Sequence, residues 1–255
     1  MDMLEKTWPH SPTRATRAAD FVTESRFGFW FLGTHTWEYE VVRDALERLT
    51  PLISAPRAGY PAVLDAGCGQ GKALGQLQQR FQPQRLIGLD VHAQALARAR
   101  RFAEKHRLQV ELLEGDCSAI PLPEASVDLV FCHQTFHHLV HQERALNEFY
   151  RVLKPGGLLL FAESTIAYID TWVIWFLFRH PRASQRSAAE YLAMMRDAGF
   201  EFRDCNLLFP YLWWSRSTLK GLLEILRLRR TPPHGEREET LIYLVATKPL
   251  VGSQS

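Results

Sequence analysis

The sequence lacks the features that mark membrane-spanning, secreted and nucleic-acid-binding proteins. No stretch reaches about 18 apolar residues without a charge, so no transmembrane helix is predicted. The N-terminus, MDMLEKTWPH, has no apolar run of the kind found in a secretory signal. Lys and Arg number 30 against 28 Asp and Glu, a balance that gives no reason to expect a nucleic-acid partner. The four cysteines contain no CxxC pair, which favours reduced thiols over disulfides or zinc, and a cytoplasmic location.

What is present fits one α/β domain with elaborations: 255 residues, of which 46% are hydrophobic. From residue 62 onward, short apolar runs alternate with stretches of helical period. The predicted strands are 62–66, 85–90, 109–115, 126–132, 157–163, 201–208 and 240–248. The predicted helices are 71–81, 93–106, 139–153 and 187–199, the last opened by a Ser187/Glu190 capping box. Strands separated by helices indicate a mostly parallel sheet with helices on both faces.

A glycine-rich loop follows the first predicted strand. Gly67, Gly69 and Gly71 let the backbone turn sharply and approach a ligand closely before a helix begins. Two common nucleotide loops do not fit: a P-loop needs Ser or Thr after Lys72, and a dinucleotide fingerprint needs Gly or Ala at position 72. The preceding acid, Asp65, suits a ligand that carries an amine and a sulfonium cation better than a pyrophosphate.

Two further acids close the next two strands. Asp90 ends the second strand, where a carboxylate can accept hydrogen bonds from both hydroxyls of a ribose. Asp116 follows the third strand, where it could accept a hydrogen bond from an adenine amino group. Each acid alone is typical of a loop or cap, but three at the carboxyl ends of successive parallel strands indicate a ligand site at that edge.

The segments VLDAGCGQG, GLDVH, EGDCSAIPLPEASVDLV and RVLKPGG resemble the successive motifs of class I S-adenosylmethionine-dependent methyltransferases, most closely the ubiquinone and menaquinone biosynthesis branch. The resemblance covers about residues 60–165 and the last helix and strands. It implies S-adenosyl-L-methionine as cofactor, with the glycine loop at the methionine moiety. The cofactor-binding residues that it implies are Asp65, Gly67, Cys68, Gly69, Gly71, Asp90, Val91, Asp116, Cys117 and His133.

The resemblance also implies the domain plan. We expect a Rossmann-like, seven-stranded, mostly parallel sheet with one antiparallel strand, in which 201–208 and 240–248 pair. Residues 1–58 are expected to form an N-terminal helical extension over the cleft. Residues 59–250 would form the methyltransferase domain, with inserted cap elements near 164–186 and 209–238.

A histidine-rich segment follows the fourth strand. His133 matches a position near the methionine part of the cofactor, and His138 matches a histidine common in this branch, where its expected role is to orient the loop. A general base helps methyl transfer to a hydroxyl, thiol or acidic carbon, and His133 is one candidate, with His138 also assigned to the catalytic set. Glu163, at the end of the fifth strand, is the competing candidate. His137 and His141 have helix-face spacing for a metal, but no further ligand completes such a set, so no metal is predicted.

Aromatic residues gather at 27–32, 168–178 and 209–214, all outside the strand–helix alternation. One interpretation is internal packing of added helices over the sheet edge. The other is a hydrophobic pocket for the methyl acceptor, because these regions surround the acceptor side of the cleft in the resembled family.

One of these regions, and a segment that follows another, also have the composition of interfacial anchors. YIDTWVIWFLF, in which Trp172 and Trp175 would share a helix face, is followed by Arg179 and Arg182. LKGLLEILRLRR, 219–230, is likewise apolar with a basic end. Aromatic bodies in the headgroup region with cations toward lipid phosphates would give peripheral contact with a membrane, at its inner face.

The sequence therefore predicts transfer of a methyl group from S-adenosylmethionine to a small, lipophilic or aromatic acceptor. The alternative is a non-catalytic protein that binds S-adenosylmethionine as a scaffold. Nucleic-acid methylation is disfavoured by the neutral charge and by the absence of an NPPY-like motif after the fourth strand. The acceptor atom and the oligomeric state are not predicted.

Overall fold

The computed structural model describes residues 25–55, 57, 59–179, 181, 184–216 and 218–250. The first 24 residues of the N-terminal extension expected at 1–58 lie outside the described residues, as do Arg182 and the tail 251–255. The side chain of Trp175 is also outside the described set.

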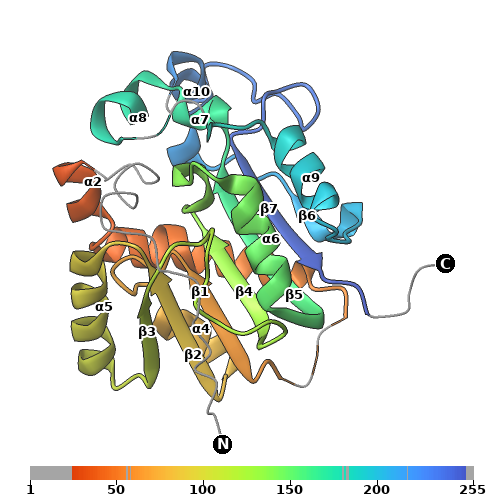
Figure 1. Cartoon of the computed structure of the whole chain (residues 1–255). Coiled ribbons are helices and arrows are strands. Elements are labelled where there is room, and N and C mark those ends of the chain that lie inside the picture. The colour runs from red at the N-terminus through yellow and green to blue at the C-terminus, as the bar shows by residue number, and fades with distance from the viewer. Residues whose placement is uncertain are drawn as a thin grey trace, which may run out of the picture.

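One seven-stranded sheet forms the centre of the molecule, in the order β3-β2-β1-β4-β5-β7-β6 (Figure 1). The strands are β1 Ala62–Ala66, β2 Arg85–Asp90, β3 Val110–Glu114, β4 Val127–His133, β5 Leu153–Ser164, β6 Leu207–Leu208 and β7 Leu241–Thr247. Strands β1 to β5 pair in parallel, and β7 is antiparallel to both β5 and β6. The expected Rossmann-like sheet with one antiparallel strand is confirmed.

The sixth strand is much shorter than the predicted 201–208. A 3-10 helix, η5 Asp204–Asn206, interrupts it, so that only an isolated bridge at Glu201 and the two residues of β6 pair with β7. The Asn206 side chain accepts a hydrogen bond from the Arg203 backbone N–H at 3.0 Å and donates one to the Leu52 carbonyl at 2.8 Å. Such side-chain bonds offer the backbone an alternative to a ladder, which alternation of apolar residues does not reveal.

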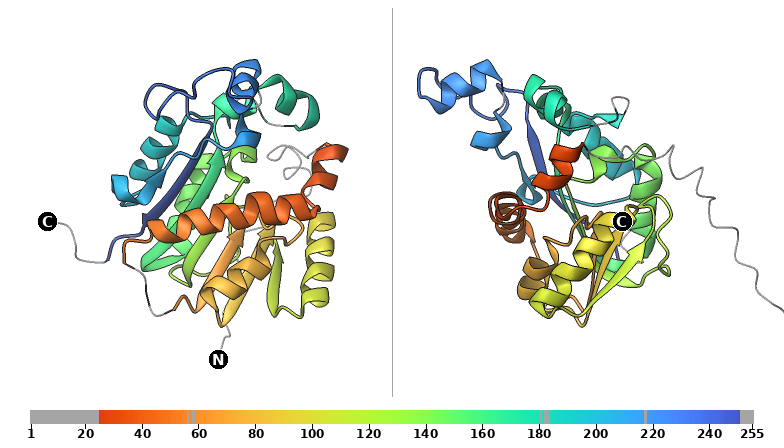
Figure 2. Two further views of the ribbon diagram at one scale, coloured as in Figure 1. Left: turned by 180° about the vertical axis from the view of Figure 1, so that it is seen from behind. Right: turned by 90° about the vertical axis from the view of Figure 1, so that its left-hand side faces the viewer.

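Helices cover both faces of the sheet (Figures 1 and 2). On one face α6 (Gln142–Val152) and α9 (Ala188–Asp197) pack their apolar sides on the strands, and Tyr191 is fully buried there. On the other face α3 (Asp44–Leu49) and α4 (Leu74–Phe81) do the same. Helix α5 (Ala93–His106) lies beside β2 and β3 and has the predicted bounds. The inner strands β1, β4, β5 and β7 are buried on both faces, and they therefore read as apolar runs, whereas β3 at the edge is only partly buried.

Short helices gather beyond the carboxyl ends of the parallel strands, at the top and left of Figure 1. They are α2 Arg26–Phe31, the π-helix η1 Trp37–Arg43, η3 Phe136–His138, α7 Ile166–Ile169, α8 Trp172–Leu177, η6 Trp213–Ser215 and α10 Leu219–Ile225. A 3-10 turn, η2 Thr50–Leu52, follows α3. In the part of the chain that the structure describes, every helix is too short or too polar to cross a bilayer.

Candidate functional site: a glycine-loop pocket beside an apolar pocket

The loop after β1 is held open by backbone geometry that only glycine adopts easily. Gly67, Gly69 and Gly71 have φ values of +80°, +52° and +79°. The N–H groups of Gly67 and Cys68 both donate to the Leu89 carbonyl, at 2.8 and 2.9 Å, which turns the chain back toward β2. A Cβ at Gly67 would overlap the Thr135 side chain, and one at Gly71 would press on Ala99 of α5. The loop therefore needs glycine for close approach as well as for φ.

Asp90, at the end of β2, fixes the loop from the side. Its Oδ2 accepts a hydrogen bond from the Gly69 N–H at 2.8 Å, and its Oδ1 accepts one from the His92 N–H at 2.8 Å. Burial raises the pKa of this carboxyl, while these backbone donors oppose the rise. Each oxygen keeps a further lone pair, so the carboxylate can still accept hydrogen bonds from a ligand.

Asp65 is the least satisfied acid of the site. Only 3% of the residue is exposed, and its Oδ2 has no hydrogen-bond partner among the described residues. Burial, and secondarily the charge of Asp90, raise the pKa of Asp65 to about 8. A buried carboxyl oxygen without a donor is costly, and a cationic ligand group would remove that cost.

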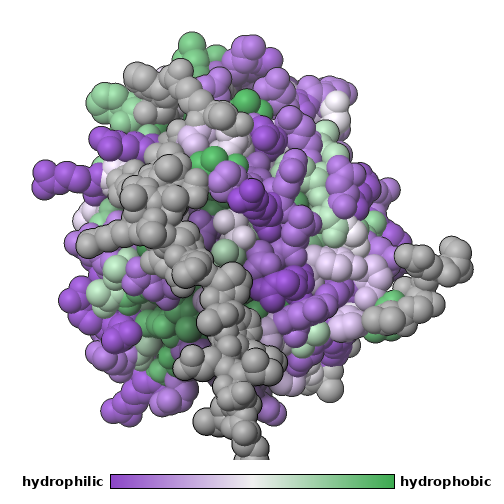
Figure 3. Space-filling view, in the orientation of Figure 1, coloured by the Kyte–Doolittle hydropathy of each residue, from purple (hydrophilic) through white to green (hydrophobic). Residues whose placement is uncertain are grey.

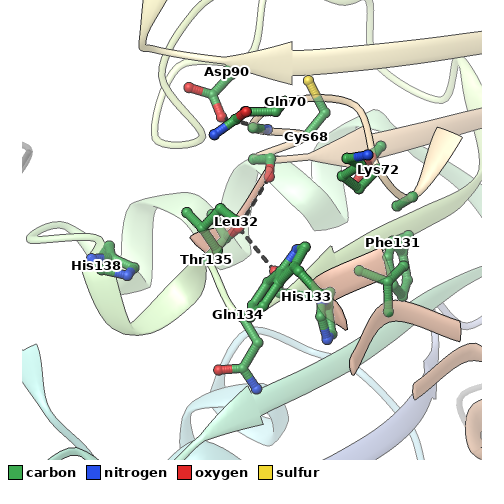
Figure 4. A pocket seen from close by; sticks show the side chains of 16 residues that line it. Leu32, Cys68, Gln70, Lys72, Asp90, Phe131, His133, Gln134, Thr135 and His138 are labelled. Atoms are coloured by element: carbon green, nitrogen blue, oxygen red, sulfur yellow. Dashed lines mark hydrogen bonds between the residues drawn. The ribbon is translucent and has the colours of Figure 1, made fainter. Parts of the chain in front are cut away.

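These acids open onto a pocket shown in Figure 4. Its wall combines the glycine loop with the end of β4 and with the N-terminal segment, which supplies Leu32 and Trp37. Thr135 joins the two halves, because its hydroxyl lies 3.2 Å from the Gly67 carbonyl and 3.1 Å from the His133 carbonyl. The amine end of an amphipathic ligand would therefore face the acids, while its other end would face aromatic rings.

The structure brings most, but not all, of the nominated residues to this pocket. Those that line it are Asp65, Gly67, Cys68, Gly69, Asp90, His133 and His138. Those outside its lining are Gly71, Val91, Asp116, Cys117 and Glu163. Asp116 accepts a hydrogen bond from the Ser118 N–H at 2.6 Å and caps that turn, and Cys117 is buried.

The N-terminal segment is fastened directly to the glycine loop. The Gln70 side-chain amide donates to the Phe29 carbonyl at 2.5 Å, and Lys72 forms a 2.9 Å ion pair with the largely buried Glu38. The Arg98 guanidinium lies 4.4 Å from the centre of the Phe29 ring. The roles of Gln70, Lys72 and Trp37 were missed from sequence, since nothing in the pattern says which loop residues meet a segment some 30 residues earlier.

His133 is placed in the pocket, but its surroundings make it a poor base. Its ring lies 5.6 Å from that of Phe131 and 5.5 Å from that of Trp37, and its Nε2 has no hydrogen-bond partner among the described residues. Burial, with a smaller contribution from His137, lowers the pKa of His133 to about 3. An imidazole of that basicity takes up protons poorly near neutrality, which argues against the expected proton-accepting role.

We expect His133→Phe to make the ligand-free protein less sensitive to acid. The pKa of His133 is lowered from 6.5 to about 3 on folding, so the unfolded chain binds a proton that the folded chain does not. The stability that this residue contributes is therefore present above pH 6.5 and is lost as the pH falls from 6.5 to about 3. At about pH 5 the difference is roughly 2 kcal/mol, measurable as thermal unfolding at pH 5 and pH 7. An acid-induced loss of stability equal to that of the wild type would contradict the assignment.

Glu163, the competing candidate for a general base, is engaged by the turn after β4. It is fully buried, and its Oε1 accepts hydrogen bonds from the N–H groups of Thr135 and Phe136, both at 2.8 Å. Its Oε2 lies 2.6 Å from Nδ1 of His137. The carboxylate therefore holds the turn after β4 in place, and it reaches neither pocket. Position at a strand end indicated a cleft residue, but the strand-end pattern cannot show which donors surround it.

A second pocket of about 300 Å³ lies against the first. It is lined by the aromatic segments of α2, α7, α8 and η6, including Phe31, Tyr168, Phe178 and Trp214. This volume is at the lower end of the range for small-molecule sites, about 300–1,000 Å³. The three aromatic clusters of the sequence thus meet around one apolar cavity.

Four residues line both pockets: Leu32, Trp37, Gln134 and His138. Gln134 is oriented by the Ser164 hydroxyl, which donates to its side-chain oxygen at 2.6 Å. Of the four, His138 is the one with an ionisable side chain. Elsewhere, the described residues contain no group of three or more potential metal ligands, and His137 is committed to Glu163.

Comparison with known proteins agrees with this geometry. Residues 64–161 match the family described as a methyltransferase domain. The chain is 36% identical over 127 residues to the demethylmenaquinone methyltransferase of Thermus thermophilus, covering 50% of this chain and 53% of that protein. It is 34% identical over 154 residues to a probable S-adenosylmethionine-dependent methyltransferase of Mycolicibacterium smegmatis, covering 59% and 56%. The matches thus span about half the length of these relatives.

The fold is shared with a solved S-adenosylmethionine-dependent methyltransferase from Aquifex aeolicus, with a TM-score of 0.61 and 21% identity over 87% of this chain and 97% of that one. Fold and pocket together define a Rossmann-like domain that binds a ligand at the carboxyl edge of its sheet. Residues 64–161 match a methyltransferase domain, and the relatives that share this region, one of them named as a probable S-adenosylmethionine-dependent methyltransferase, imply S-adenosylmethionine as the cofactor. The unpartnered Asp65 oxygen and the close glycine turn fit that group.

Proposed function

We propose that the protein transfers a methyl group from S-adenosylmethionine to a small lipophilic acceptor held in the apolar pocket. The observation that carries the proposal is the contact between the two pockets, which share Trp37, Gln134 and His138. A relative named for demethylmenaquinone supports a small molecule as acceptor. A lipophilic acceptor would come from a membrane, so peripheral membrane contact is part of the proposal.

S-adenosylmethionine, when bound, supplies a methyl group attached to a sulfonium sulfur. That sulfur is a good leaving group, because it departs as a neutral thioether. Asp65 and the glycine loop would hold its amino-acid end, and Asp90 would hold hydroxyls of its ribose. Leu32 and Trp37 lie at the boundary between the pockets, where their apolar side chains would exclude water. The contribution of the chain is mainly proximity and orientation, which can amount to about 7–11 kcal/mol of a barrier.

A proton must leave when the acceptor atom is a hydroxyl or an acidic carbon. His138 is the titratable group shared by both pockets, so we assign proton acceptance to it rather than to His133 or Glu163. His138→Gln would then lower turnover with little change in cofactor affinity. A KM change without a change in turnover would instead indicate that His138 only positions the acceptor.

The acceptor pocket can be tested by filling it. Val173 of α8 lines the apolar pocket but not the glycine-loop pocket. We expect Val173→Phe to raise the acceptor KM by about tenfold or more, since extra carbons in a close-packed site force displacement of the ligand. Affinity for S-adenosylmethionine, measured by calorimetry, should not change.

The matched control is Trp172→Phe, on the same helix but 71% exposed and outside the pocket lining. Acceptors would be found by incubating labelled donor with a panel of lipid and small-molecule extracts. Formation of S-adenosylhomocysteine that depends on an acceptor supports transfer. Its absence across the panel, with cofactor binding intact, would favour the non-catalytic scaffold.

A further inference from the structure

Helix α10 is inverted relative to an ordinary surface helix. Its exposed side carries Leu219, Leu222 and Ile225, which are 71%, 49% and 38% exposed, and Leu226 follows at 57%. The charged residue Glu224 points inward instead: it is 6% exposed and accepts a hydrogen bond from the Tyr211 hydroxyl at 3.0 Å. Surface helices of water-facing proteins place charges outward and apolar residues inward. This helix presents an apolar face that nothing else in the described chain covers.

The same edge of the molecule carries exposed aromatic side chains from three other elements. Trp30 of α2, Trp172 and Phe176 of α8, and Trp213 of η6 are 61–77% exposed. Trp213 also lines the apolar pocket, so the exposed surface is continuous with the pocket wall. Figure 1 places α8 and α10 together at the top of the molecule, and Figure 3 shows apolar surface on that rim.

Cations accompany this apolar surface. Within residues 218–230 the charged side chains other than Glu224 are Lys220, Arg227, Arg229 and Arg230, and all four are exposed. The segment therefore presents leucines and basic groups outward, with its acid turned inward. That combination is the one that binds the interface of an anionic bilayer, with apolar groups below the headgroups and cations at the phosphates.

We propose that the surface formed by α8, η6, α10 and residues 226–230 docks on an anionic lipid bilayer, so that the apolar pocket opens toward the lipid. The role of this docking, which is to supply a lipophilic acceptor, rests on the proposed function, whereas the docking itself is argued from the exposed residues. A second copy of the chain is a poorer occupant. A two-fold interface brings the same patch of each copy together, and would place the like-charged Arg227, Arg229 and Arg230 of both copies in one interface.

The test is flotation of the full-length protein with vesicles of phosphatidylcholine alone or mixed equally with phosphatidylglycerol. We expect partitioning to be at least about tenfold stronger on the anionic vesicles and to weaken in high salt. Leu222→Ser/Leu226→Ser and Arg229→Glu/Arg230→Glu should each reduce it by about tenfold or more. Affinity for S-adenosylmethionine should not change in either variant.

Leu250→Ser is the matched control, because Leu250 is 63% exposed but lies near Gly156, at the amino end of β5 and away from the carboxyl ends of the parallel strands. It should float like the wild type. Wild-type protein that stays with the soluble fraction overturns the proposal, as does a lipid-free dimer that Leu222→Ser/Leu226→Ser dissociates. Methyl transfer to a detergent-dispersed acceptor is assayed separately. Flotation without methyl transfer supports the docking surface and contradicts the proposed function. Methyl transfer without flotation supports the proposed function and contradicts the docking surface.

Discussion

Replacing Asp65 by asparagine is expected to stabilise the ligand-free protein while abolishing its binding of S-adenosylmethionine. Asp65 is buried, one of its oxygens has no hydrogen-bond partner among the described residues, and its pKa is raised to about 8. A neutral amide removes the need to keep that carboxyl protonated in the fold. The same change removes the carboxyl oxygen that lacks a partner among the described residues, and with it the negative charge that the ligand amine would stabilise on binding, which should cost affinity about 100-fold or more.

The pH dependence follows from the direction of the shift. The pKa of Asp65 is 3.8 in an ordinary setting and about 8 in the fold, so the folded chain holds a proton that the unfolded chain releases. The stability associated with this residue is fully present below 3.8 and lost as pH rises to about 8. At about pH 7 the linkage amounts to roughly 4 kcal/mol, from which imperfect amide hydrogen bonding leaves a gain of about 1–3 kcal/mol.

Chemical denaturation at pH 5 and pH 7 measures the stability change, and calorimetry measures the binding. Asp128→Asn is the control, because Asp128 is equally buried but accepts hydrogen bonds from the Ala62 N–H at 2.9 Å and from Lys154 at 2.8 Å. That variant should lose stability. If Asp65→Asn also loses stability, or if it binds S-adenosylmethionine as the wild type does, Asp65 does not have the proposed role.

The second large effect is expected for Gly67→Ala. The new methyl group would overlap Thr135, and φ at +80° is unfavourable for any residue with a Cβ. Relief would require the turn after β4 to move away from the glycine loop, although Glu163 holds that turn by two backbone hydrogen bonds. We expect a loss of about 2–5 kcal/mol of stability and no measurable cofactor binding.

Substitutions at two other glycines separate the steric cost of the new methyl group from the cost of a positive φ. Gly69→Ala has φ of +52° with open space around the new methyl, so it carries only the backbone cost, about 1 kcal/mol. Gly59→Ala has neither a positive φ nor a neighbour and should be neutral. Thermal unfolding of the three variants, followed by calorimetry, gives the order of their stabilities, with Gly67→Ala expected to be the least stable and Gly59→Ala the most stable. A Gly67→Ala protein no less stable than Gly69→Ala would show that the contact with Thr135 is not tight.

The parts of the fold that were predicted well are those governed by periodicity. Strands 62–66 and 85–90 and helix 93–106 have the predicted bounds, because burial on both sheet faces and on one helix face repeats regularly along the chain. The capping box at Ser187 and Glu190 was readable for the same reason, since it depends on neighbours in sequence. The prediction of a continuous strand over 201–208 was wrong, because Asn206 forms a hydrogen bond with a residue more than 150 positions earlier.

For the candidate site, the sequence indicated the edge of the sheet at which it lies, but not the burial or the hydrogen-bond partners of each side chain. Asp65, Asp90 and the loop glycines follow from motif position, and they meet in one pocket. The burial of His133 between Phe131 and Trp37 and the saturation of Glu163 depend on contacts between distant segments. The π-helix that carries Trp37 has no signal in the apolar pattern.

The fastening of the N-terminal segment to the glycine loop has a kinetic consequence. The Phe29 carbonyl is tied to Gln70 and Glu38 to Lys72, and Leu32 and Trp37 complete the pocket wall. We expect the cofactor to enter and leave past this segment, so that its exchange requires those bonds to open. Turnover then has an upper limit set by the opening rate of one short segment, independent of how fast the methyl group itself moves.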